Sequence, residues 1–226
     1  MNKKIVLSFV TILVAVAGIV AMSAYEAHVI NVTAHIENAL KVIPPDKFVF
    51  GTVFPQEYLQ KMLSITTSES FCENDQRRVL NIDYKIVQKP KCWNNDPVNP
   101  EYAPVDYATH ECPEIDTVQY IKMPSLCPFL SKTPKDPDGD SGVLAFHNPE
   151  DSSSVAVGTI NKDHDLLDEW IIDLIVPCFK DMCSQDWDEF VHQYNPSANP
   201  DDYILPANLE SKDFGCDLWV EVTDIY

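Results

Sequence analysis

The chain has 226 residues and a formal net charge of −19, with 35 acidic side chains against 16 basic ones. A surface this acidic repels the phosphates of nucleic acids and of anionic lipid headgroups, so we expect no nucleic-acid partner. The length is enough for one sizeable core and argues against a second full domain.

The first 24 residues have the layout of a secretory signal peptide. Lys3 and Lys4 make a basic start, and a run of apolar and small residues follows from Ile5 to Ala21. This run is about 17 residues long, at the short limit for crossing a bilayer, so a retained membrane anchor is the alternative. We predict a signal peptide at 1–24, a secreted or surface-displayed domain at 25–226, and membrane contact only through the N-terminal segment.

Alternation of apolar and polar residues, which is typical of a half-buried strand, dominates the mature chain. It begins at residues 28–37, where Ile30 and Val32 fall on one side and Asn31 and Thr33 on the other. The same pattern recurs along the chain with varying strength. The further predicted strands are Phe48–Val53, Leu59–Thr67, Leu80–Ile86, Val155–Ile160, Trp170–Val176 and Cys216–Val222.

About seven short strands, most with one polar face, are what two antiparallel sheets packed face to face require. We therefore predict an all-β fold, a jelly-roll or Ig-like antiparallel β-sandwich. One short helix is expected within Met182–Tyr194, where apolar residues recur at helical spacing, and Asn195-Pro196 would end it.

Residues 90–154 lack this alternation and are rich in proline, which removes backbone donors from a sheet, so we predict an insertion without strands. Loops on a rigid scaffold commonly carry recognition, and aromatic side chains in this one suit stacking on a sugar or a partner, or packing on each other. These aromatic residues are Trp93, Tyr102, Tyr107, Tyr120 and Phe129.

The mature chain carries all seven cysteines, and an oxidising compartment would let them pair. Three disulfides and one free thiol are expected, with a connectivity that the sequence leaves open. Cys178 and Cys183 flank four residues and plausibly close a small loop, whereas the spacing of a zinc knuckle is missing. The seven are Cys72, Cys92, Cys112, Cys127, Cys178, Cys183 and Cys216.

A glycine-containing acidic turn carries Asp136, Asp138 and Asp140 at alternate positions, so that their oxygens could converge on calcium. A solvated turn is the alternative, because the sixth and twelfth positions of a calcium loop would hold Ser141 and His147 in place of Gly and Glu. We predict no other cofactor.

Catalytic motifs are weak in this sequence. Gly139–Gly142 resembles the nucleophile signature of trypsin-like serine proteases, with Ser141 as nucleophile and His35 as base, but His35 lies in an alternating strand. No HExxH motif or helical histidine pair occurs, and His164 in its acidic surroundings reads as a metal ligand or as a charged turn before a strand. We therefore expect no catalytic residue, with a secreted hydrolase as the alternative.

The export signal, the alternating run Val29–Leu40 and the segment Phe50–Glu57 together resemble the TasA/camelysin family. The resemblance implies export with a dedicated signal peptidase of the W type, a jelly-roll β-sandwich and a role as an extracellular fibre subunit of bacterial biofilm matrix; protease activity is attributed to camelysin. Ser131–Pro134 and Phe214–Val222 are also similar to uncharacterised secreted proteins of candidate-phylum bacteria, a group with no known activity.

The sequence therefore predicts a non-catalytic secreted or cell-surface protein, acting as a matrix or fibre subunit or as an adhesion component. It would associate with itself or with other cell-surface proteins. If residues 28–37 leave their own sheet and complete that of a neighbour, edge pairing would give a polymer. The alternatives are a secreted hydrolase and a calcium- or glycan-binding surface module centred on residues 90–154.

Overall fold

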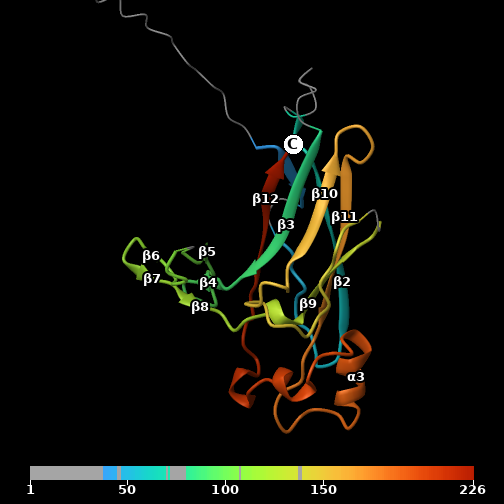
Figure 1. Ribbon diagram of the computed structural model, residues 1–226. Helices are drawn as coiled ribbons and strands as arrows, with labels where there is room; N and C mark the ends of the chain where they lie inside the picture. The colour runs from blue at the N-terminus through green and yellow to red at the C-terminus, as the bar shows by residue number, and fades with distance from the viewer. Residues whose placement is uncertain (1–37, 45–46, 70, 72–79, 107, 137–138) are drawn as a thin grey trace, which may run out of the picture. The chain divides into compact units, whose positions relative to one another are not determined.

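The computed structural model describes residues 38–44, 47–69, 71, 80–106, 108–136 and 139–226, which form an all-β, sandwich-like fold with a single α-helix in this described part (Figure 1). The first predicted strand, at residues 28–37, lies outside the described residues. No helix among the described residues has both the length and the apolar character needed to cross a membrane.

One layer of the sandwich is a four-stranded antiparallel sheet. Its strands are β1 (Leu40–Ile43), β2 (Tyr58–Thr67), β9 (Leu130–Pro134) and β11 (Leu167–Ile175). The strand order is β1-β2-β11-β9. In the central strand β11, Trp170, Ile172 and Leu174 are buried, and the residues between them are half-buried. This sheet therefore presents a mainly apolar face to the interior.

The second layer is a three-stranded antiparallel sheet of β3 (Asn81–Lys89), β10 (Ala156–Asn161) and β12 (Asp217–Ile225). The strand order is β10-β3-β12, which places β3 in the centre. Ile82, Tyr84 and Ile86 of β3 are buried, while the residues between them are half-buried. The two layers together hold seven strands, which confirms the predicted all-β sandwich.

A single core cluster joins the two sheets. Leu63 and Ile65 of β2 pack in the same cluster as Tyr84 and Ile86 of β3. Trp170 of β11 reaches across this core, and its indole N–H donates a hydrogen bond of 2.7 Å to the hydroxyl of Tyr84. Burial of each large apolar side chain contributes about 1.5–3 kcal/mol, so this shared core is the main source of the stability of the sandwich.

The predicted helix begins later than its pattern suggested. The α-helix α3 comprises Trp187–Tyr194, and Trp187 and Val191 face the core. Residues 182–186 are not helical because Cys183 is tied back to Cys178 by a disulfide just before the helix. Three short 3₁₀ helices complete the helical structure of the described residues: η1 (Cys127–Phe129), η2 (Pro200–Tyr203) and η3 (Ala207–Leu209).

The insertion contains strands, so the prediction that residues 90–154 include no sheet is wrong. Its short strands are β4 (Lys91–Trp93), β5 (Tyr102–Pro104), β6 (Glu114–Ile115), β7 (Val118–Gln119) and β8 (Ile121–Lys122). They form a β5-β4-β8 sheet and a β6-β7 hairpin beyond the end of β3 (Figure 1). The strand β9 even belongs to the main sandwich, because its one proline, Pro134, stands at its last position.

The predicted strand at Phe48–Val53 is also wrong, since this segment has no strand partner. Phe48, Phe50 and Val53 instead pack individually against the core as half-buried residues. Gly51 adopts a positive φ of 78°, a conformation that interrupts an extended ladder. The alternating pattern of residues 48–53 therefore reflects side chains that pack on the core, and not a strand that pairs with a neighbour.

Candidate functional site

The acidic turn predicted to bind calcium is only partly described, because Asp138 lies outside the described residues. Asp136 is exposed, whereas Asp140 is half-buried and accepts a hydrogen bond of 3.1 Å from the backbone N–H of Thr159. Asp140 and Asp83 line a common hollow of about 290 Å³ beside β10. No group of three His, Cys, Asp or Glu side chains suited to a metal occurs among the described residues. Calcium binding by this turn stays a prediction.

The other candidate catalytic residues are not brought together in the described part of the chain. Ser141 is exposed, and its backbone pairs with that of Val157 through two hydrogen bonds of 2.9 Å. Its proposed base, His35, lies outside the described residues. His164 lies in the turn between β10 and β11, where its backbone N–H donates to Asn161 Oδ1 at 3.1 Å. The charged-turn interpretation of His164 agrees with this position.

The aromatic residues of the insertion divide between core and surface. Tyr120 is buried in a small second core with Cys92, Ala103 and Val105. Tyr102 is exposed, and Lys91 Nζ lies 4.9 Å from its ring centroid. Of the others, Phe129 packs edge-on against Phe146 in the main core and Trp93 is half-buried, while Tyr107 lies outside the described residues. Packing therefore accounts for two of these rings and leaves Tyr102 on the surface.

Six of the seven cysteines form three disulfides, Cys92–Cys112, Cys127–Cys216 and Cys178–Cys183. The plausible Cys178–Cys183 pairing is confirmed, and Cys72 lies outside the described residues. Disulfides persist in oxidising compartments, so these three indicate an extracellular or comparable environment. Cys127–Cys216 spans 89 residues and links η1, within the insertion, to the residue before β12 of the sandwich.

Lys132 lies fully inside the sandwich, with 0% of its surface exposed. It stands in β9 opposite Ile172 of β11, and opposite residues of an antiparallel pair project from the same face. Ile172 faces the core, so the lysine amine enters the core as well. Among the described residues no carboxylate forms an ion pair with Lys132. Burial lowers the pKa of Lys132 to about 7.

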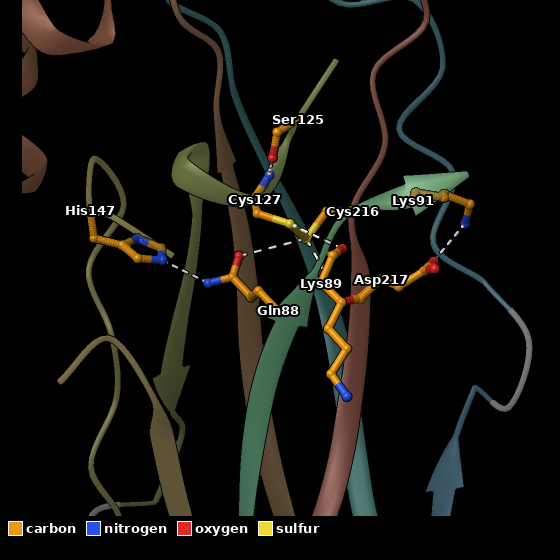
Figure 2. The surroundings of a disulfide bond; sticks show 8 residues. All are labelled: Gln88, Lys89, Lys91, Ser125, Cys127, His147, Cys216 and Asp217. Atoms are coloured by element: carbon orange, nitrogen blue, oxygen red, sulfur yellow. Dashed lines mark hydrogen bonds and ion pairs between the residues drawn. A yellow bond between two sulfur atoms is a disulfide. The ribbon is translucent and has the colours of Figure 1, made fainter. Parts of the chain in front are cut away.

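The partners of this buried amine are Gln88 of β3 and, beyond it, His147. In the orientation that satisfies its hydrogen bonds, the Gln88 carbonyl oxygen accepts one bond from Lys132 Nζ and another, of 2.7 Å, from His147 Nε2. The Gln88 amide nitrogen then donates to the Cys127 carbonyl at 2.6 Å. Figure 2 draws the carboxamide turned by half a rotation, with its nitrogen toward His147. That orientation sets the Gln88 nitrogen against the Lys132 amine and the Gln88 oxygen against the Cys127 carbonyl, so the rotated carboxamide is the one whose hydrogen bonds are satisfied.

His147 is buried against the same cluster, which we call the Lys132 cluster: Lys132, Gln88 and His147. Burial and, second, the charge of Lys132 lower the pKa of His147 to about 4, although the Leu144 carbonyl acts in the opposite direction. The imidazole is therefore neutral at physiological pH. The cluster lies beside a disulfide, since the Gln88 carboxamide approaches Cys216 Sγ to 3.7 Å (Figure 2).

Sequence reasoning missed the Lys132 cluster and noted His147 only as a poor twelfth position of a calcium loop. One signal was present: Lys132 follows Leu130 by two residues, so that a strand through them places a lysine on the apolar face. That signal could be used only after β9 was recognised as a strand. Gln88 and His147 could not be found this way, because they lie 44 residues before and 15 residues after Lys132 in the chain.

The outer edge of β12 is a second notable surface. No other strand of the described residues pairs with this edge, although β12 is nine residues long. Leu218 and Val220 contact the core from β12 but stay half-buried, and Val222 and Ile225 are exposed. The inner face of β12 is therefore only partly covered, and its backbone offers a row of donors and acceptors.

Ion pairs connect β12 to lysine side chains of β3 and β4. Lys89 and Lys85 bind Glu221 at 2.9 and 3.1 Å, and Lys91 binds Asp217 at 3.1 Å. Burial acts to raise the pKa of Glu221, but the hydrogen bonds from Lys89 and Lys85 outweigh it and hold the pKa below its usual value. The Glu221 pairs fix β12 to β3, and the Asp217 pair links it to Lys91 of β4. No strand of the described residues pairs with the other edge of β12.

The chain matches no known family model, no curated protein and no solved structure. The resemblance to the TasA/camelysin family therefore stays a prediction.

Proposed function

We propose that this protein is a non-catalytic extracellular β-sandwich that assembles with copies of itself, as a matrix, fibre or adhesion component, by accepting a strand at the outer edge of β12. The observation that carries the proposal is the unpaired edge of β12 within the described part of the chain. An exposed edge of nine residues is long enough to bind a further strand through main-chain hydrogen bonds.

The predicted occupant is the alternating segment at residues 28–37 of a neighbouring copy. This segment is ten residues long and precedes β1 by only two residues. Its apolar side, which includes Ile30 and Val32, would cover the half-buried Leu218 and Val220. It contains one acidic residue, Glu37, and so largely avoids the repulsion expected in a chain of net charge −19.

Two features expected of an exported protein support the same proposal. The three disulfides suit an oxidising environment, and the layout of residues 1–24 is that of an export signal. Cleavage of this leader would place the predicted strand at residues 28–37 near a new N-terminus, from which it would enter a second molecule.

Two double variants of the mature chain test the proposal with the same added charge on opposite faces of the same segment. Ile30→Asp with Val32→Asp places carboxylates on the apolar side and is expected to abolish assembly. Asn31→Asp with Thr33→Asp places them on the polar side and is expected to preserve it. Electron microscopy and light scattering would measure the outcome, with circular dichroism as the control for folding.

Wild-type protein that stays a monodisperse monomer at every salt concentration and pH would contradict self-assembly. Equal assembly of both double variants would contradict the role given to the apolar side of residues 28–37. Assembly that occurs only when a different surface protein is added would contradict self-assembly and would support a role in adhesion.

A further inference from the structure

The Lys132 cluster places a nucleophile and an acyl group in contact inside the core. Lys132 comes from β9 in one sheet, and Gln88 comes from β3 in the other. The lysine amine contacts the oxygen of the Gln88 carboxamide, and the carbonyl carbon lies only one bond, about 1.2 Å, beyond that oxygen. Reacting groups held this close gain the rate advantage of an intramolecular reaction.

A lysine that served only for packing would destabilise the folded protein at this position. A fully buried ammonium without a carboxylate partner carries a large desolvation penalty, and lysine is almost never fully buried unless it is paired. Since the pKa of Lys132 falls to about 7, a large share of the amine is neutral and nucleophilic near neutral pH. Conversion of the amine into an amide would remove the ionisable group from the core altogether.

We propose that Lys132 and Gln88 form an intramolecular isopeptide bond that covalently joins the two sheets of the sandwich. The neutral Lys132 Nζ attacks the carbonyl carbon of Gln88, and the bond between that carbon and the amide nitrogen of Gln88 breaks. Nζ loses one proton, the departing nitrogen gains it, and one molecule of ammonia leaves. The step needs no oxidant, reductant or further reactant.

His147 and Cys127 are placed to assist this step. The Nε2–H of the neutral His147, 2.7 Å from the Gln88 oxygen, stabilises the negative charge that develops on this oxygen in the tetrahedral intermediate. The Cys127 carbonyl, 2.6 Å from the Gln88 nitrogen, holds the leaving nitrogen on the opposite side of the carboxamide. The Cys127–Cys216 disulfide in turn fixes the position of this carbonyl.

The intact mass of the wild-type mature protein, denatured and with its disulfides reduced, tests the proposal directly. The measured mass is expected to be lower than the sequence mass by one ammonia, and tandem mass spectrometry of a digest is expected to recover a branched peptide that contains Gln88 and Lys132. Protein at full sequence mass, with Lys132 free to be cleaved by trypsin, would overturn the bond.

Matched variants locate the reaction. Lys132→Met is expected to restore the full mass expected of that variant, while Lys135→Met, which removes an exposed lysine three residues away that pairs with Glu169, is expected to retain the loss of ammonia. His147→Ala is expected to slow cross-linking in freshly purified protein. A persistent loss of ammonia in Lys132→Met would overturn the assignment to Lys132, and an unchanged rate in His147→Ala would overturn the role of His147.

Thermal melting separates a covalent role from a packing role. Replacement of a buried charged group by an apolar side chain of similar volume is commonly neutral or stabilising. If the bond forms, however, Lys132→Met also removes a cross-link that closes a long loop, and the midpoint of unfolding is expected to fall. A midpoint that rises or stays unchanged in Lys132→Met would contradict the cross-link. None of these measurements depends on assembly through β12, so either proposal can fail without the other.

Discussion

The sandwich and the insertion are stabilised in different ways. The sandwich buries Trp170, Tyr84 and Ile172 in one shared core, and its two large sheets contact each other through these side chains. The β5-β4-β8 sheet has only four fully buried residues in its own cluster, and one of these, Cys92, is cross-linked to Cys112. A small core gives little stability by burial, so the insertion depends on a covalent link where the sandwich depends on packing.

The Lys132 cluster lies in the sandwich core, next to a disulfide that links the insertion to the sandwich. Lys132 and Gln88 come from the sandwich strands β9 and β3 and His147 from the segment before β10, and the cluster touches the Cys127–Cys216 disulfide. This is also the one place where a fully buried lysine enters the described core. A disulfide therefore lies directly beside the point where a polar cluster interrupts the apolar packing of the core.

The largest effect is expected from removing the central aromatic side chain of the sandwich. Trp170→Ala would leave a large cavity and remove the hydrogen bond donated to Tyr84, so we expect a loss of about 3–5 kcal/mol in the free energy of unfolding. Denaturant unfolding followed by circular dichroism would measure it.

Trp219→Ala is the matched control for this prediction, because Trp219 is half-buried on β12 with Lys89 Nζ 3.4 Å from its ring centroid. We expect its loss to cost about 1 kcal/mol. Equal effects of the two substitutions would argue that the described core is not the main source of stability.

A smaller and more local effect is expected from opening the insertion. Cys92→Ser with Cys112→Ser removes a disulfide that spans 20 residues, which is expected to cost about 3 kcal/mol in a chain-entropy model. The cost should appear as faster proteolysis within residues 90–126, while the sandwich keeps its cooperative melting.

Cys178→Ser with Cys183→Ser is the control for this pair, since it opens a loop of much shorter sequence separation, 5 residues. Limited proteolysis with mapping of the fragments would separate the two variants. Loss of the whole fold on removal of Cys92–Cys112 would show that insertion and sandwich unfold as one unit.

The smallest effect concerns acid stability at the edge strand β12. The pKa of Glu221 is depressed in the folded protein, so this carboxylate contributes stability that is present above its unfolded pKa, about 4.3, and is lost as the pH falls through its folded value. Glu221→Gln should therefore reduce the free energy of unfolding at neutral pH by less than about 1 kcal/mol. The variant should also lose less stability than the wild type as the pH falls into the acidic range.

Thermal melting between neutral pH and mildly acidic pH would measure this difference, with Glu150→Gln, at an exposed position outside the sheets, as the control. An identical acid limb for wild type and Glu221→Gln would show that the bonds from Lys85 and Lys89 do not contribute to holding β12.

Much of the sandwich could be predicted because its long strands are half-buried. β2, β3, β10, β11 and β12 follow the predicted segments closely, since each has one face on the core and one toward solvent. The strands of two to three residues in the insertion were missed, because alternation cannot be recognised over so short a length. The segment at 48–53 shows the reverse error, since a core-facing pattern exists there without a ladder partner.

Some features of the candidate sites could likewise be predicted from the sequence, and others could not. The Cys178–Cys183 link could be predicted because a short spacing brings the thiols together whatever the fold, but the other two pairings could not. The Lys132 cluster required three segments to meet, and the open edge of β12 required the order of strands in a sheet to be known.

The sequence by itself determined the all-β class, the acidic surface, the cysteine content and the position of the long strands, because each depends on composition or on a period of two residues. Only the tertiary structure decided which sheets the strands join, which cysteines pair across 20 and 89 residues, and that Lys132 lies in the core against Gln88. These features depend on contacts between residues far apart in the chain, and such contacts are set by the packing of two sheets around one core.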